Sequence, residues 1–158
     1  MTQFVIRSAT SDDAATIADF NLRIAAETED TSLDRDLVTR GVRALLDDGS
    51  RGRYFMACAD QLVIGQIMHT REWSDWRNGD IWWLQSVYVR PDHRRRGVFK
   101  LLHEHVKALA ASDPGVVGLR LYVDGDNHVA QATYERLGMT AARYHIMEDL
   151  FSASAGQV

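Results

Sequence analysis

Cysteine is nearly absent from this sequence, since Cys58 is the only one among 158 residues. A lone thiol forms no intrachain disulfide and no cysteine metal cluster, so we expect a protein of a reducing, cytoplasmic compartment. Long hydrophobic runs are also absent: no apolar stretch approaches the roughly 20 residues that span a bilayer, and the first residues lack the apolar core of a signal peptide. We therefore expect a soluble, unexported protein with no membrane partner.

An excess of positive charge is lacking too. The chain carries 18 Lys and Arg against 22 Asp and Glu, a formal net charge of -4, which argues against nonspecific binding of nucleic acid. Arg94 to Arg96 is a local exception, and a steep salt dependence of DNA or RNA affinity would be needed to support nucleic-acid binding through these residues. The six histidines show no compact metal-ligand spacing, because His103 and His105 point to different faces of a predicted helix. We expect no metal site.

The length of the chain suits one domain, predicted over residues 1–151, with 152–158 as a frayed tail. Turn signals and apolar periodicity predict an α/β (α+β) order of elements. It comprises a strand at 4–7, a helix ending near 27, a helix capped by Asp34, strands at 53–59, 62–70 and 81–89, a helix from 98, a strand at 117–123, a helix at 129–137 and two short strands within 139–151. A crossover makes the strand at 117–123 parallel to the strand at 81–89.

The run Arg94-Arg95-Arg96-Gly97-Val98-Phe99 connects a buried strand to an amphipathic helix. The first amides of a helix lack intrahelical partners and lie at the positive end of its dipole. A phosphate group can therefore accept several main-chain hydrogen bonds there. Gly97 lets such a ligand approach the backbone closely. The pattern predicts an anion site at the start of this helix.

These six residues resemble the signature of the GCN5-related N-acetyltransferase (GNAT) family, which reads Gln or Arg, two variable residues, Gly, one variable residue, then Gly or Ala. Phe99 stands where the family has the last small residue. A second segment resembles the family's second signature through Asn127, Ala130, Tyr134 and Leu137-Gly138. The order of elements is similar as well. The resemblance implies a mixed, mostly antiparallel sheet of about six or seven strands with about four helices, in which two central parallel strands splay apart.

The resemblance also implies a function, the transfer of acetyl from acetyl-CoA to a primary amine of a small molecule or peptide. The pantetheine arm is then expected to pair with Val87, Tyr88 and Val89, and the pyrophosphate to rest on Arg94, Arg95, Arg96, Gly97, Val98 and Phe99. Asn127 either binds the pantetheine region or makes a local turn bond. Tyr134 either gives a proton to the departing thiolate or is a packed aromatic of a short helix. The acceptor's identity stays open, as does the choice between a monomer and a homodimer.

No general base is evident in the strand at 81–89. Many family members have a carboxylate or histidine early in this strand, whereas this chain has Trp82, Trp83, Leu84 and Gln85. A water chain or a carboxylate from elsewhere is then required; Glu27, Glu29 and Glu72 are the candidates, but the better reading of each is an ordinary solvated side chain, and no base is named. The alternative function is a catalytically silent CoA-binding regulatory module.

Four tryptophans are concentrated in one predicted hairpin. Trp82 and Trp83 are adjacent in a strand and must face opposite sides of the sheet, so at least one belongs to the core. The others, with Trp73 and Trp76, form either an aromatic wall for the acceptor or plain packing.

Overall fold

Five strands form one sheet in the computed structural model, which describes residues 3–151. The sheet order follows the chain: β1 (Phe4–Ser8), β2 (Gly52–Ala59), β3 (Leu62–Ser74), β4 (Gly79–Val89) and β5 (Val116–Leu121). Neighbouring strands from β1 to β4 are antiparallel. The pair β4 and β5 is parallel, as the crossover predicts.

Four α-helices connect these strands or follow them. They are α1 (Ala14–Glu29), α2 (Arg35–Asp47), α3 (Val98–Ser112) and α4 (His128–Arg136), with short 3-10 turns η1 (Ser11–Asp13) and η2 (Pro91–His93). The predicted cap of α2 is confirmed, because an Asp34 carboxylate oxygen accepts from the Asp36 amide over 2.9 Å and from the Leu37 amide over 3.3 Å. Within residues 3–151, no helix combines the length and the apolarity needed to cross a membrane.

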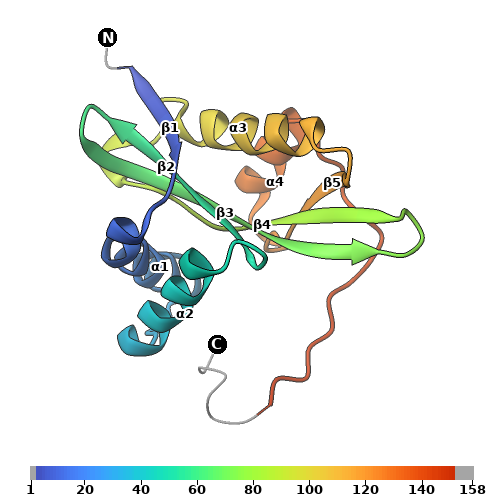
Figure 1. Ribbon diagram of the computed structural model, residues 1–158, viewed down its shortest axis with the longest axis horizontal. Coiled ribbons are helices and arrows are strands. Elements are labelled where there is room, and N and C mark those ends of the chain that lie inside the picture. The colour runs from blue at the N-terminus through green and yellow to red at the C-terminus, as the bar shows by residue number, and fades with distance from the viewer. Residues whose placement is uncertain (1–2, 152–158) are drawn as a thin grey trace. The chain divides into compact units, whose positions relative to one another are not determined.

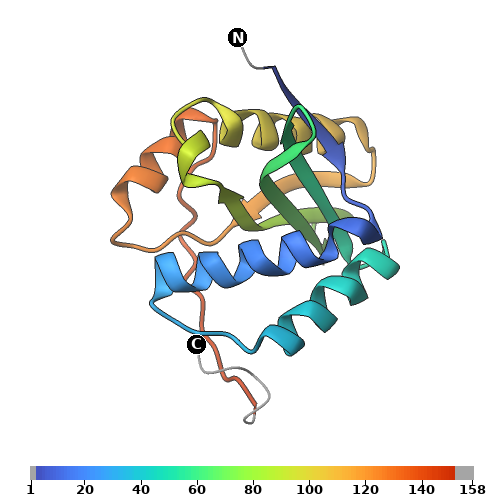
Figure 2. The same ribbon diagram turned by 90° about the vertical axis from the view of Figure 1, so that its left-hand side faces the viewer.

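The sheet carries a separate apolar core on each face. Residues Trp82 and Leu84 of β4 pack with Leu102 and Val106 of α3. The opposite face of β2, including Met56, packs against α1 and α2. Figures 1 and 2 show α3 on one side of the sheet and α1 with α2 on the other. In β2 and β3, residues that point to opposite faces therefore belong to different cores.

The contacts divide the chain into two compact units, Met1–Leu121 and Tyr122–Val158. The first unit contains the sheet and helices α1 to α3, and the second contains α4. The single domain predicted over 1–151 stays a prediction. The predicted tail at 152–158 lies outside the described residues.

The pair of short strands predicted within 139–151 is wrong, and with it the count of six or seven strands. The structure has no strand in residues 139–151, although this segment is rich in exposed apolar side chains: Tyr144, Ile146, Met147, Leu150 and Phe151. A strand forms only where its amides and carbonyls pair with a neighbouring strand. Apolar alternation shows that a segment could become a strand, but it does not supply that partner.

Candidate functional site

A β-bulge interrupts β4 just before its carboxyl end. Gln66 of β3 lies opposite Tyr88, but Met68 lies opposite Gln85, so β4 has one residue more than β3 between these pairs. Ser86 has φ +51°, a conformation that few residues other than glycine adopt. The extra residue shifts the alternation of the strand, so that Val87 and Val89 pack against the α3 core.

A buried polar network holds this bulge. Gln66 is fully buried, and its Nε2 donates to the Ser86 carbonyl over 3.0 Å and to Asn21 Oδ1 over 2.9 Å. Asn21 Nδ2 in turn donates to the Tyr54 hydroxyl over 3.2 Å. Sequence reasoning missed these residues, since the bonds join positions 20 to 45 residues apart and no local pattern indicates them.

Pairing between the two parallel strands ends just before the bulge, and we call the unpaired edge of β4 beyond that point the opening between the strands. The register of β4 and β5 runs from Asp80 opposite Val116 to Leu84 opposite Leu121, where β5 ends. In the first unit, as far as it is described, residues 85–89 of β4 therefore have no strand on the β5 side. Main-chain groups on this edge are available to a ligand that pairs as a strand does. The predicted pantetheine-binding residues Val87, Tyr88 and Val89 all lie in this segment.

Helix α3 follows β4 after η2 and the arginine turn. Gly97 is its N-cap, with φ +82° and ψ 5°. The first helical bond runs from the Leu101 amide to the Gly97 carbonyl over 3.1 Å, so the amides of residues 98–100 precede it. A Cβ built on Gly97 meets no atom within 4 Å, which leaves room for an anion close to the backbone. Val98 is 1% exposed in the α3 core, so it can offer a ligand only its main chain.

The three consecutive arginines have different partners. Arg94 Nε donates to the Val89 carbonyl over 2.8 Å, and its Nη2 donates to Glu27 of α1 over 2.7 Å. This side chain therefore fastens the turn to β4 and α1. Arg96 lies over the Phe4 ring, with its guanidinium carbon 5.3 Å from the ring centroid. Arg95 has φ +61° and is exposed. Phe99 is half-buried, and its ring lies 6.1 Å from that of His103.

The second unit carries the two remaining predicted residues. Asn127 is the N-cap of α4, and its Oδ1 accepts from the Ala130 amide over 3.0 Å. The local bond that the sequence left as an alternative is thus formed. Tyr134 lies in α4, and burial raises the pKa of its phenol. Its hydroxyl therefore keeps its proton at neutral pH.

Polar side chains lie on the sheet face opposite α3, beside the point where the strands separate. Gln85 Nε2 donates to Thr70 Oγ1 over 2.6 Å, and Arg120 Nη1 donates to Glu72 Oε2 over 2.6 Å. Of the carboxylates considered as bases, Glu27 and Glu72 are thus both paired with arginine. Glu29 is exposed at the end of α1.

The tryptophans of the β3–β4 hairpin divide between core and surface. Trp82 is 1% exposed and stacks on His69, with ring centroids 3.8 Å apart, which confirms that at least one belongs to the core. Trp73 and Trp76 are 65% and 87% exposed. The aromatic wall for an acceptor stays a prediction.

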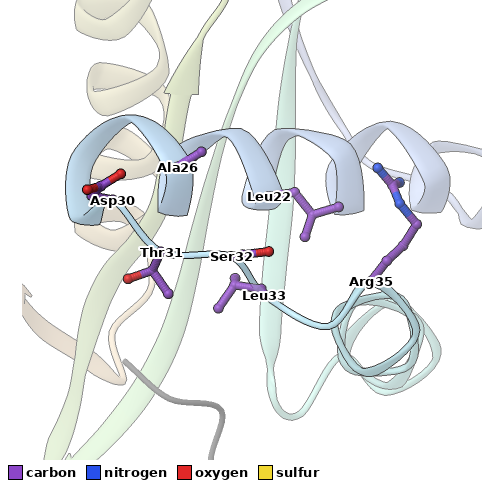
Figure 3. A pocket seen from close by; sticks show the side chains of 7 residues that line it. All are labelled: Leu22, Ala26, Asp30, Thr31, Ser32, Leu33 and Arg35. Atoms are coloured by element: carbon purple, nitrogen blue, oxygen red, sulfur yellow. The ribbon is translucent and has the colours of Figure 1, made fainter.

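A surface hollow of about 490 Å³ lies between α1 and the loop that leads to α2 (Figure 3). It is lined by Leu22, Ala26, Asp30, Thr31, Ser32, Leu33 and Arg35. Glu27, which binds Arg94, belongs to the same end of α1. Among residues 3–151, no three His, Cys, Asp or Glu side chains are arranged to hold a metal ion.

Comparison with known proteins identifies this arrangement. The model of the acetyltransferase (GNAT) family matches residues 18–139. A mycothiol acetyltransferase of Rhodococcus jostii (strain RHA1) is 31% identical over 119 residues, which are 71% of this chain and 36% of that protein. The chain thus spans about a third of the length of this relative.

Solved structures agree with the family match. The crystal structure of a possible acetyltransferase from Clostridium difficile 630 is 46% identical, with a TM-score of 0.89 over 94% of this chain and 98% of that one. An aminoglycoside N-acetyltransferase, AAC(6')-Iy, in complex with CoA has a TM-score of 0.77 over 95% of this chain and 96% of that one. At 18% identity this second likeness shows the fold alone.

The separated parallel strands, the bulge and the open N-terminus of α3 thus occur in an acetyltransferase fold. The chain belongs to the GNAT family of acetyltransferases. The predicted fold class is confirmed, apart from the number of strands and the central place of the parallel pair, because within residues 3–151 β5 is an edge strand of the sheet.

Proposed function

We propose that this chain transfers an acetyl group from acetyl-CoA to a primary amine, by direct attack of the amine on the thioester. One observation carries the proposal: the pairing of β4 with β5 ends at Leu84 and Leu121, and the segment of β4 beyond it leads through η2 and the arginine turn to the N-terminus of α3. A strand edge followed along the chain by an anion site suits a ligand with an extended, amide-containing arm that ends in a pyrophosphate.

The binding residues divide by the groups they offer. Val87, Tyr88 and Val89 are proposed to contact the pantetheine arm through main-chain groups of this edge, where the Val89 carbonyl also accepts from Arg94 Nε. The amides at the start of α3 and the charges of Arg95 and Arg96 stabilise the pyrophosphate. Arg94 acts on the turn itself, through Val89 and Glu27. Gly97 allows the close approach, because nothing lies within 4 Å of where its Cβ would be.

The reaction forms a C–N bond and breaks the C–S bond of the thioester. The amine loses one proton, and the leaving thiolate gains one. Tyr134 is proposed as the donor to the thiolate, a role that suits a phenol whose pKa burial has raised. No side chain is assigned as the base; with Glu27 and Glu72 both paired, the amine's proton is proposed to leave through water.

The test combines binding with turnover. Calorimetry with acetyl-CoA and with CoA measures affinity, and thiol release with a broad amine panel measures transfer, with mass spectrometry identifying the acetylated product. Binding with turnover supports the proposal. Binding without turnover on any amine would support the silent CoA-binding module instead, and absence of binding would overturn both.

A further inference from the structure

The face of the sheet opposite α3 carries an ion pair that the proposed reaction does not use. Leu119 and Leu121 of β5 pack against the α3 core together with Trp82 and Leu84. Arg120 lies between these two leucines and opposite Trp83, so its side chain is on the other face. There it reaches over β4 to Glu72 of β3, with 2.6 Å between Nη1 and Oε2.

Arg120 has more hydrogen-bond donors than its bond to Glu72 uses. A guanidinium carries five N–H groups in a planar fork that matches a carboxylate. Among the described residues, the bond to Glu72 is the one hydrogen bond and ion pair that Arg120 makes. Its side chain is 31% exposed and that of Glu72 is 41% exposed. Glu72 thus fixes the guanidinium, while a second carboxylate can still bind it from solvent.

Gln85 supplies a complementary group beside the opening between the strands. Its Nε2 donates to Thr70 Oγ1 over 2.6 Å, which orients the side-chain amide. In the part of the chain that is described, its Oε1 accepts no hydrogen bond, so it can accept one from an amine. Gln85 is the first residue of β4 beyond the last pair with β5. It lies two residues, about 7 Å, from the position opposite Arg120.

We propose that the amine acceptor is a compound of the amino-acid type, whose carboxylate binds Arg120 and whose amine is directed toward the opening by Gln85. This inference rests on the proposed acetyl transfer and names its substrate class. The Glu72–Arg120 pair carries no net charge, so it suits an acceptor bearing both signs better than a polycation. The acceptor approaches from the face opposite α3, which keeps its carboxylate away from the anion site at Gly97.

The experiment compares matched acceptors in the thiol-release assay. Each of the common amino acids is measured beside its own carboxamide, which keeps the amine and removes the negative charge. We expect kcat/KM for the best amino acid to exceed that for its carboxamide at least tenfold. Equal values, or preference for spermidine or an aminoglycoside over every amino acid, would overturn the inference. This comparison needs no variant, so it does not depend on any substitution folding.

Variants then test whether the preference for the amino acid over its carboxamide comes from the Glu72–Arg120 pair. Arg120→Gln is expected to lower kcat/KM at least tenfold for the amino acid and less than twofold for the carboxamide, with acetyl-CoA affinity unchanged. Arg71→Gln is the matched control. It also removes one positive charge, but Arg71, which is next to Glu72 in β3, points to the opposite face of the sheet. Equal losses on acid and carboxamide would contradict recognition of a carboxylate by Arg120.

Failure of this inference is distinguishable from failure of the proposed function. If acetyl-CoA binds and other amines are acetylated while amino acids are not, the inference alone fails. If acetyl-CoA does not bind, or if it binds and no amine is acetylated, the proposed transfer fails, and the inference fails with it.

Discussion

Gln66 and Ser86 are joined by a partly buried hydrogen bond in which Gln66 Nε2 donates to the Ser86 carbonyl over 3.0 Å. The same nitrogen donates to Asn21 Oδ1 over 2.9 Å, so both hydrogens of the amide are used. The first bond links β3 to the bulged residue of β4, and the second links β3 to Asn21 of α1. The bulge is therefore fixed from the side opposite to the opening between β4 and β5.

Replacing Gln66 tests whether this network positions the site. Gln66→Met keeps the length of the side chain but removes both bonds, which leaves the Ser86 carbonyl and Asn21 Oδ1 without those donors. We expect the free energy of unfolding to fall by about 1–3 kcal/mol, measured by urea denaturation, and acetyl-CoA affinity to fall about tenfold by calorimetry. Gln61→Met, at an exposed position of the β2–β3 turn, is the control. Unchanged affinity in the folded Gln66 variant would show that the bulge does not need Gln66.

Gly97 is required by its backbone conformation and not by crowding. Its φ is +82° and a Cβ there meets nothing within 4 Å, so Gly97→Ala should cost about 1–2 kcal/mol of stability through strain alone. Gly97→Pro also removes an amide and fixes φ near -65°. We expect it to weaken CoA binding at least tenfold in a folded protein, measured by calorimetry.

Gly41→Ala is the matched control for Gly97→Ala. Gly41 lies within α2, and a Cβ there also meets nothing within 4 Å. In a helix this change should stabilise the protein by about 0.5–1 kcal/mol and leave CoA affinity unaltered. Normal CoA affinity in the folded Gly97→Pro variant would place the pyrophosphate elsewhere.

Tyr134→Phe tests the proposed proton donor, because it keeps the ring and removes the hydroxyl. If the phenol protonates the thiolate, kcat should fall about 10²-fold with little change in stability or acetyl-CoA affinity. Stopped-flow or steady-state thiol release measures this. Tyr144→Phe removes a hydroxyl from a side chain that is 65% exposed and should change none of these quantities. Loss of stability with normal turnover would make Tyr134 a packing residue.

His69 makes stability depend on pH. Burial, with the charges of Arg53 and Arg71, lowers its pKa from 6.5 to about 4. Between these values the unfolded chain binds a proton that the folded chain does not, so stability is complete above pH 6.5 and falls as the pH drops toward 4. One pKa unit corresponds to about 1.4 kcal/mol, so the total loss should be roughly 3 kcal/mol.

Urea unfolding at pH 7.5, 6, 5 and 4 measures this loss. His69→Phe keeps a ring against Trp82 and should reduce the loss of unfolding free energy between pH 6.5 and 4. Part of the loss should remain, because burial also lowers the pKa of His103 and of His105. The same substitution at the exposed His145 should leave the slope as it is. An unaltered slope in the His69 variant would refute the assignment.

The features that the sequence predicted correctly are local ones. Asp34 caps α2 with its own carboxylate, as predicted. Gly97 begins α3 in the left-handed conformation. Each depends on the chemistry of one to four neighbouring residues, which a sequence shows directly.

The sequence was insufficient where a feature depends on partners distant along the chain. Residues 139–151 have the apolar content of strands but no strand pairs with them. The phosphate contact expected of Arg94 stays a prediction, and the bond of its guanidinium to Glu27, 67 positions away, is one that no local pattern indicates. In both cases the outcome depends on which other segment lies within hydrogen-bonding reach.

The sequence alone determined the order of most elements, the helix caps, the glycine turn that begins α3 and the resemblance to an acetyltransferase family. The tertiary structure decided the bulge at Ser86, the polar network beneath it and the Glu72–Arg120 pair across β4. The physical reason is that periodicity and capping act over one or two turns of chain, whereas a bulge or a cross-strand ion pair exists only once the register of three strands is fixed.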